Sequence, residues 1–183
     1  MKRDIAGLEH KHDLVKKIVG YCIQLSNEGR VILILGQPGC GKSVFMSQLY
    51  DELNDKVEYL TAIRAEFSEE GEPPNRIYEL FEEVSDKDSP KVLLLDSLDV
   101  LAYTRRRELQ EWLFYVDKLK NIKGMTIICA SRSFEAEHLY PMSEQKWSEK
   151  YTLEFLPDVF IQRVFEKLKC NANNISIDFH KFI

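Results

Sequence analysis

The sequence lacks any long hydrophobic run, and its longest aliphatic stretch, residues 31–35, is far short of the roughly 20 residues that span a bilayer. No apolar segment follows the N-terminal Met-Lys-Arg, so no secretory signal is predicted. An excess of positive charge is also missing, because 25 Lys and Arg stand against 30 Asp and Glu and give a net charge of −5. We therefore expect a cytoplasmic protein without membrane contact, and net charge does not indicate nucleic-acid binding.

Cysteine pairs and sequence repeats are absent as well. Four cysteines, Cys22, Cys40, Cys129 and Cys170, form no CxxC pair and no metal-ligand spacing with the histidines. A reduced chain is therefore expected. No internal repeat or low-complexity tract is present, and 44% hydrophobic with 30% charged residues is the composition of an ordinary folded domain.

Short apolar runs alternate with amphipathic segments along the chain. The runs predict strands at residues 31–35, 57–63, 92–95, 125–130 and 151–155. Helical spacing of apolar residues predicts helices at 14–25 (ending near Gly29), 45–53, 77–84 and 109–119, and another after Pro157. Segment 68–76 is rich in Gly, Pro and charge and is predicted to be an exposed loop. The alternation predicts a three-layer α/β domain with a parallel sheet.

One segment between a predicted strand and a predicted helix matches the phosphate-binding pattern GxxxxGK[ST]; it reads Gly36-Gln37-Pro38-Gly39-Cys40-Gly41-Lys42-Ser43. Its glycines allow successive backbone N–H groups to point at phosphate oxygens. Lys42 would bring a positive charge to the β and γ phosphates of a nucleotide, and Ser43 a hydroxyl suited to Mg²⁺. We include Val44 in the predicted contact segment. The alternative is a structural glycine turn with a surface lysine, which the flanking strand and helix argue against.

The aliphatic run 92–95 ends in Asp96, and Asp99 follows one short turn later. In P-loop enzymes a carboxylate at the end of such a strand holds Mg²⁺, so Asp96 is the predicted metal residue, although it could simply cap a turn. Asp99 is predicted to orient the attacking water. The alternative for Asp99 is a solvated residue at the start of the next helix.

Arginines follow two other segments. Ser131 and Arg132 follow the apolar run 125–130. At the sheet edge that carries the phosphate loop, Arg132 would sense the γ-phosphate; the alternative is a solubilising arginine at the end of a strand. The cluster 105–107 is interleaved with Glu108 and Glu111, which favours a solvated helix face over an arginine finger or a nucleic-acid patch.

The segments GQPGCGKS, LLLDSLD and IICASR together resemble motifs of the additional-strand P-loop ATPases, the group that includes AAA+ and STAND proteins. They are most similar to the bacterial NACHT-like or STAND branch, over about residues 4–169. The resemblance implies a P-loop NTPase fold with a five-stranded, mainly parallel sheet of order 5-1-4-3-2. It implies these roles: phosphate and Mg²⁺ binding by Lys42 and Ser43, Mg²⁺ binding by Asp96, water activation by Asp99 and γ-phosphate sensing by Arg132.

The resemblance also divides the chain. Residues 1–155 would form the ATPase core, with an N-terminal segment and helix at 1–30 and the sheet with its crossover helices at 31–155. Residues 156–183 would begin a C-terminal helical lid, which we expect to be truncated. One departure is Ser97, because many AAA+ ATPases have the catalytic Glu at this position.

The Ser97 departure favours an Mg²⁺-ATP-binding module that hydrolyses ATP slowly and acts as a nucleotide-dependent switch in a larger regulatory or defence protein. Its partners would be ATP and ADP, together with other domains of a longer chain or a second copy. One alternative is an AAA+-type oligomeric motor or loader, with an arginine finger given in trans by one of residues 105–107. The other is a small-molecule or nucleotide kinase, although such enzymes normally have a lid with several arginines.

Overall fold

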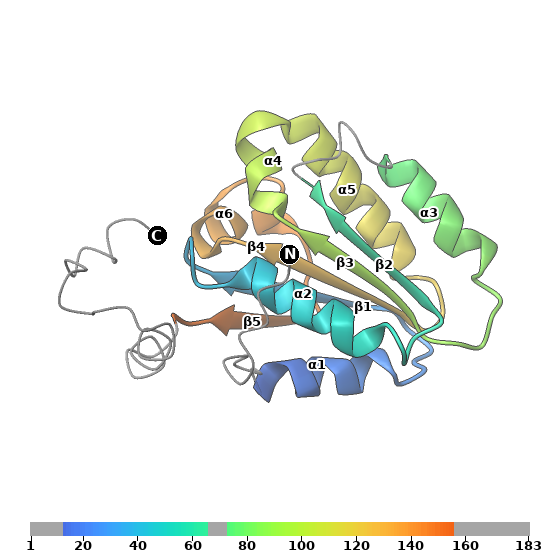
Figure 1. The fold of residues 1–183 in the computed structure, drawn as a ribbon. Helices are drawn as coiled ribbons and strands as arrows, with labels where there is room; N and C mark the ends of the chain where they lie inside the picture. Colours follow the sequence, from blue (N-terminus) through green and yellow to red (C-terminus); the bar gives the residue numbers. More distant parts are fainter. Residues whose placement is uncertain (1–12, 66–72, 156–183) are drawn as a thin grey trace, which may run out of the picture.

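The computed structural model describes residues 13–65 and 73–155, and its centre is a five-stranded sheet of order β2-β3-β4-β1-β5 (Figure 1). All neighbouring strands pair in parallel. The predicted order 5-1-4-3-2, read from the other edge, is confirmed. The strands are β1 (Arg30–Gly36), β2 (Tyr59–Arg64), β3 (Lys91–Asp96), β4 (Met125–Ser131) and β5 (Glu149–Leu153).

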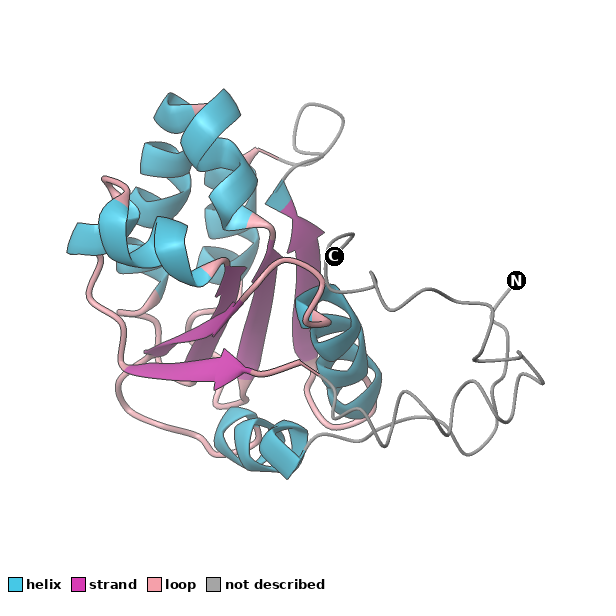
Figure 2. Ribbon diagram, turned by 90° about the vertical axis from the view of Figure 1, so that its left-hand side faces the viewer, coloured by secondary structure: helices cyan, strands magenta, loops and turns pink. Residues whose placement is uncertain are grey.

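Helices cover both faces of this sheet (Figure 2). On one face, α1 (Asp13–Cys22) and α2 (Lys42–Leu53) pack their apolar residues against the strands. The opposite face is covered by α3 (Pro74–Glu83), α4 (Leu98–Thr104), α5 (Arg106–Leu119), α6 (Ser133–His138) and the short 3₁₀ helix η2 (Met142–Glu144). The predicted three-layer α/β architecture is confirmed.

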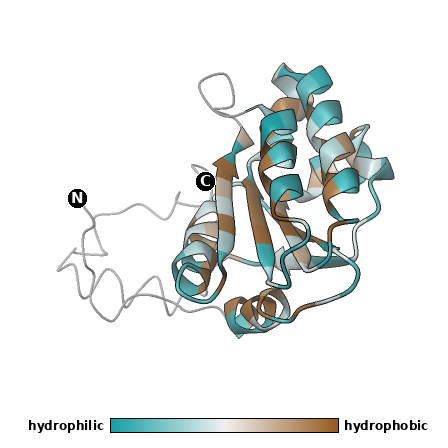
Figure 3. Cartoon of the chain, turned by 90° about the vertical axis from the view of Figure 1, so that its right-hand side faces the viewer, coloured by the Kyte–Doolittle hydropathy of each residue, from teal (hydrophilic) through white to brown (hydrophobic). Residues whose placement is uncertain are grey.

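Successive side chains of each central strand point to opposite faces of the sheet, and helices bury both faces. This is why the predicted strands are almost continuously hydrophobic. In β1, Leu33 faces the layer that contains α5, and its neighbours Ile32 and Ile34 face the layer of α1 and α2. All three side chains are fully buried. The central strands β1, β3 and β4 are accordingly mainly hydrophobic, whereas the helices show both hydrophobic and hydrophilic residues (Figure 3).

The first helix ends earlier than predicted. Helix α1 stops at Cys22 rather than near Gly29, and Leu25 is 45% exposed. Past Cys22 the backbone bonds to distant segments, since Gly124 N–H donates to the Ser26 carbonyl at 2.8 Å. Gly29 does not end a helix; it lies where the backbone passes close to Lys120, because a Cβ there would lie 2.4 Å from the carbonyl oxygen of Lys120.

The predicted loop 68–76 is wrong at its end, because helix α3 begins at Pro74. Proline is well suited to the first turn of a helix, where its missing N–H would have no helical partner. Residues 68–72 and the predicted lid 156–183 lie outside the described residues. The short elements α6 and η2 were not predicted, since neither is long enough to show a helical period.

Two absences hold for the described part of the chain. None of its helices has the length and apolar character needed to cross a membrane. Its three cysteines, Cys22, Cys40 and Cys129, are buried and free of disulfides. Burial raises the pKa of the Cys22 thiol to about 12 and the pKa of the Cys129 thiol also rises for the same reason, so these two are unreactive core residues.

A buried lysine stands at the edge of the sheet opposite the phosphate loop. Lys91 begins β3 with its side chain inside, and its Nζ donates to the carbonyls of Lys87 (2.7 Å), Ser89 (3.1 Å) and Lys123 (3.2 Å). Burial lowers the pKa of Lys91. The ammonium therefore joins the loops before β3 and before β4.

We expect Lys91→Met to lower the free energy of unfolding by about 1–3 kcal/mol, because it leaves three carbonyls without their shared donor. Urea unfolding followed by circular dichroism measures the change. The matched control is Lys87→Met, whose side chain is exposed and which should stay within about 0.5 kcal/mol of wild type. Equal stability of both variants would contradict the linking role of the Lys91 ammonium.

Candidate nucleotide-binding site

The predicted site residues follow the carboxyl ends of three neighbouring strands. Strands β1 and β4 pair so that Leu35 lies opposite Ser131, which places the start of the phosphate loop beside Arg132. Strands β4 and β3 pair with Cys129 opposite Leu95, one residue before Asp96. Parallel pairing therefore brings the loop, Arg132 and Asp96 to one edge.

The phosphate loop has the backbone that its glycines allow. Gly39 (φ 79°) and Gly41 (φ 96°) adopt left-handed conformations, and Gly41 caps the N-terminus of α2. Gly36 is required for space, because a Cβ there would lie 2.4 Å from the Cys40 sulfur and 2.9 Å from the Leu153 carbonyl oxygen. The segment Gln37, Pro38 and Gly39 is exposed, as are Ser43 and Val44 in the first turn of α2.

Lys42 lies over this loop. Its Nζ donates to the carbonyl oxygens of Gly36 at 2.9 Å and Gln37 at 3.0 Å. The first turn of α2 presents N–H groups that have no partner within the helix, together with the positive end of the helix dipole. An ammonium and a helix N-terminus at one loop form an environment that suits phosphate.

Ser43 and Asp96 line one cavity of about 610 Å³ between α2 and β2. Arg64, the last residue of β2, lies opposite Asp96 in the register and lines the same cavity, with its Nε 3.9 Å from Asp96 Oδ2. A hydroxyl and a carboxylate are oxygen ligands of the kind that Mg²⁺ accepts together with water and phosphate. No group of three or more Cys, His, Asp or Glu side chains within 13–65 and 73–155 would hold an ion unaided.

Asp99 reaches the site through a sharp turn after β3. Ser97 has φ 64°, a left-handed conformation that is uncommon outside glycine, and α4 begins directly after it. Asp99, in the first turn of α4, is 4% exposed. Burial raises the pKa of Asp99, and the charge of Glu135 acts in the same direction, whereas Arg132 and Lys42 lower it. The solvated alternative for Asp99 is therefore wrong.

Arg132 is paired with Asp99. Its Nε lies 2.9 Å from Asp99 Oδ2, and its Nη1 lies 3.8 Å from Oε1 of Glu135. The hydroxyl of Tyr103 donates to the same Glu135 oxygen at 3.1 Å. The structure thus brings Asp99 and Arg132 together, and it adds two residues that were not among the predicted ones.

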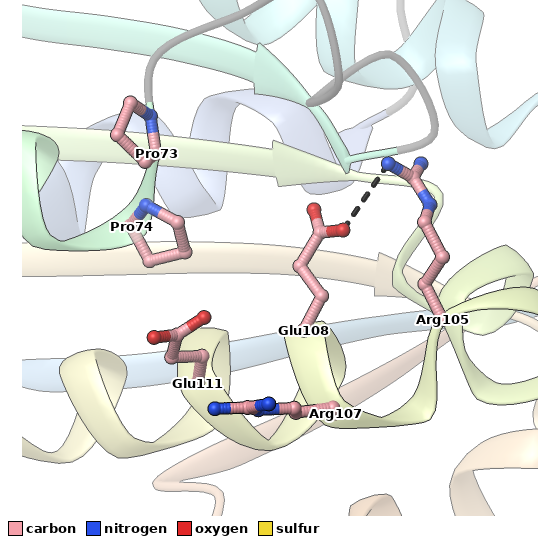
Figure 4. A pocket seen from close by; sticks show the side chains of 6 residues that line it. All are labelled: Pro73, Pro74, Arg105, Arg107, Glu108 and Glu111. Carbon is pink, nitrogen blue, oxygen red and sulfur yellow. Dashed lines mark ion pairs between the residues drawn. The ribbon is translucent and has the colours of Figure 1, made fainter.

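In the cluster 105–107, Arg105 lies between α4 and α5, and Arg106 and Arg107 begin α5. Arg105 pairs with Glu108 at 3.1 Å and donates to the Ala65 carbonyl at 3.2 Å. Arg106 and Arg107 are exposed. Arg105 and Arg107 line a second cavity, of about 450 Å³, with Pro73, Pro74, Glu108 and Glu111 (Figure 4). The solvated-face prediction fits Arg106 and Arg107, whereas Arg105 is half-buried.

Three residues of the site were missed by sequence reasoning: Arg64, Tyr103 and Glu135. Arg64 carried a usable signal, since it follows a predicted strand just as Arg132 does. Glu135 carried a weaker one, because an acid three residues after an arginine on a helix can reach it. Tyr103 carried none, because its contact joins residues 32 positions apart.

Comparison with protein families gives a match that covers the site. The model of the "ATPase family associated with various cellular activities (AAA)" matches residues 32–143. This range contains the phosphate loop, Asp96, Asp99 and Arg132. Among curated proteins no sequence matches the chain.

Comparison with solved structures finds chains with the same fold. The C. elegans PCH-2 structure is 17% identical, with a TM-score of 0.55, and the match covers 90% of this chain and 50% of that one. The FIGL-1 AAA domain in complex with ADP is 16% identical, with a TM-score of 0.60, and the match covers 89% of this chain and 59% of that one. A structure described as the structural basis for katanin self-assembly is 15% identical, with a TM-score of 0.59, and the match covers 86% of this chain and 55% of that one. The chain thus spans half to three fifths of these longer chains.

We expect Gly36→Ala to lower the free energy of unfolding by about 1–3 kcal/mol, because the added methyl would collide with the Cys40 sulfur and the Leu153 backbone. Chemical unfolding measures the loss. The matched control is Gly20→Ala inside α1, where nothing lies within 4 Å of the new methyl. This control should gain about 0.5–1 kcal/mol from helix propensity. A neutral Gly36→Ala variant would show that the loop is not closely packed.

Proposed function

The chain belongs to the AAA family of ATPases, and from this we propose that it binds Mg²⁺-ATP at the phosphate loop and hydrolyses it to ADP and phosphate. One observation carries the proposal: the loop, Lys42, Asp96 and the Asp99–Arg132 pair meet at one edge of the sheet. The family match favours hydrolysis over phosphate transfer to a small-molecule acceptor.

Each residue has a role that follows from its place. The loop N–H groups and Lys42 bind the phosphates, with contacts from residues 36–44. Ser43 and Asp96 would hold Mg²⁺, which neutralises phosphate charge when bound. Asp99 is buried beside Arg132 and within reach of the Lys42 charge, where it can orient a water molecule toward the γ-phosphate. Arg132 senses that phosphate.

We propose further that the domain works in a self-associated form, as an AAA+-type motor or loader does. The solved structures with the same fold favour this reading over an isolated switch, and one of them is described by its self-assembly. Arg106 and Arg107 are exposed on α5 and available to a neighbouring copy. We place the protein in the cytoplasm and assign residues 156–183 to a helical lid beyond the core 1–155.

One observation favours the slow switch as a second candidate. Ser97 stands after Asp96 where many AAA+ ATPases have a catalytic Glu, and its backbone is left-handed. Turnover would then depend on Asp99, whose carboxylate is already paired with Arg132. A STAND or NACHT-like module of a bacterial protein would fit slow hydrolysis of this kind.

The first test is nucleotide affinity. We expect Lys42→Ala to weaken ATP binding in Mg²⁺ about tenfold or more, because it removes charged hydrogen bonds to the phosphates. Isothermal titration calorimetry measures this, with Lys16→Ala on the exposed face of α1 as the matched control. Unchanged affinity in the Lys42 variant would refute the proposed function.

The second test separates the self-associated ATPase from the switch. We expect ATP to produce oligomers in light scattering, and the hydrolysis rate per chain to rise with protein concentration. Arg106→Ala and Arg107→Ala, tested singly, identify an arginine that acts in trans, because such a variant would lose rate while still binding ATP. A monomer with a constant rate per chain would instead favour the switch.

A further inference from the structure

Asp99, Tyr103, Arg132 and Glu135 form a compact group, the Arg132 cluster, at the edge of the proposed ATP site. They come from two helices and one strand end: α4 supplies Asp99 and Tyr103, Arg132 follows β4, and α6 supplies Glu135. Side-chain exposure divides them sharply, since Arg132 is 43% exposed whereas Asp99 and Glu135 are 5% and 6% exposed. Two buried carboxylates thus flank one guanidinium that remains open to the site.

The two carboxylates differ in how closely their oxygens are paired with cations and hydrogen-bond donors. Asp99 has a short contact with Arg132 Nε, at 2.9 Å. Glu135 has a longer one to Nη1 at 3.8 Å and accepts from the Tyr103 hydroxyl through Oε1. Its other oxygen, Oε2, is buried with no hydrogen-bond partner among the described residues. Burying a carboxylate with so few partners costs stability, and this cost makes Glu135 a candidate for a functional role.

Asp99 occupies Nε of Arg132, so a phosphate meets the guanidinium either through its Nη groups or by taking the place of Asp99. Contact that includes Nε requires the guanidinium to exchange Asp99 for the γ-phosphate. Glu135 is the other anion against the same guanidinium, and it comes from the helix that starts directly after Arg132. An arginine held at Nη1 can turn its remaining N–H groups without leaving the edge.

We propose that Glu135 is a positioning residue that holds Arg132 at the sheet edge while the guanidinium exchanges Asp99 for the γ-phosphate. The preference of the site for nucleoside triphosphate over diphosphate then depends on Glu135. This inference rests on the proposed function, because it assigns γ-phosphate sensing to Arg132. Tyr103 supports the arrangement by fixing Oε1 of Glu135.

The exchange has a direct consequence for the variant Glu135→Gln. The amide retains the shape and an oxygen that accepts from Tyr103, but it loses the charge that attracts Arg132. Within the cluster Asp99 is then the sole anionic partner of Arg132, and the guanidinium stays with it. The triphosphate then loses its contact between the γ-phosphate and Arg132. Binding of the diphosphate, which has no γ-phosphate, is unaffected.

The experiment compares affinities for ATPγS and ADP, each with Mg²⁺, by calorimetry on the full chain. We expect Glu135→Gln to lower the preference for ATPγS about threefold to tenfold and to leave ADP affinity within about twofold. The matched control is Glu137→Gln, an exposed glutamate on the same helix, which should change neither affinity. Tyr103→Phe, which removes the hydroxyl that donates to Glu135, should lower the preference in the same direction but less.

A thermodynamic cycle with Arg132→Ala separates positioning from structural support. In the Arg132→Ala background we expect Glu135→Gln to have no further effect on the preference, since its only route is through the arginine. An additive effect there, an unchanged preference in Glu135→Gln, or an equal loss for both nucleotides would overturn the inference.

Two further measurements keep the result interpretable. If Glu135→Gln melts below the assay temperature, Tyr103→Phe decides, and an unchanged preference in that variant overturns the inference. Lys42→Ala shows whether the proposed function itself stands. Weak binding by Lys42→Ala together with wild-type behaviour of Glu135→Gln would refute only the role of Glu135.

Discussion

The site depends on the parallel pairing of every strand in the sheet. Because β1, β3 and β4 run in the same direction side by side, their carboxyl ends meet at one edge. The phosphate loop, Asp96 and Arg132 leave different strands and still become neighbours. An antiparallel strand would send its terminal side chain to the opposite edge, where Lys91 lies. Both faces of these strands are buried by helices, and this burial stabilises the arrangement.

Charge at this edge is arranged locally. The chain as a whole is acidic, with a net charge of −5, so no general field attracts a nucleotide. Binding would depend instead on backbone N–H groups, on Lys42 and on two arginines that are already paired with carboxylates, Arg64 with Asp96 and Arg132 with Asp99. Such pairing keeps buried carboxylates compensated and leaves each arginine close to a place where phosphate charge would enter.

The turn after β3 determines where Asp99 lies in the site. Ser97 takes a left-handed conformation, and this bend starts α4 at once and places Asp99 in a buried first turn beside Arg132. The residue type at 97 suggested a slow switch, whereas the function proposed first is a self-associated ATPase of the AAA family that the chain matches. Both readings use the same Asp99 and differ in what a second copy would add.

Local patterns in the sequence determined the order of helices and strands, the phosphate loop and the polar residues that end each strand. These features depend on near neighbours: runs of apolar residues, the spacing of glycines and one charged residue after a strand. The strand order followed from the resemblance to a known group of ATPases. Only the tertiary structure decided where α1 ends, why Gly29 is a glycine, and which partners Arg64 and Arg132 take. Those outcomes join segments far apart in the chain, and their physical basis is strand register and helix packing, which no local pattern specifies.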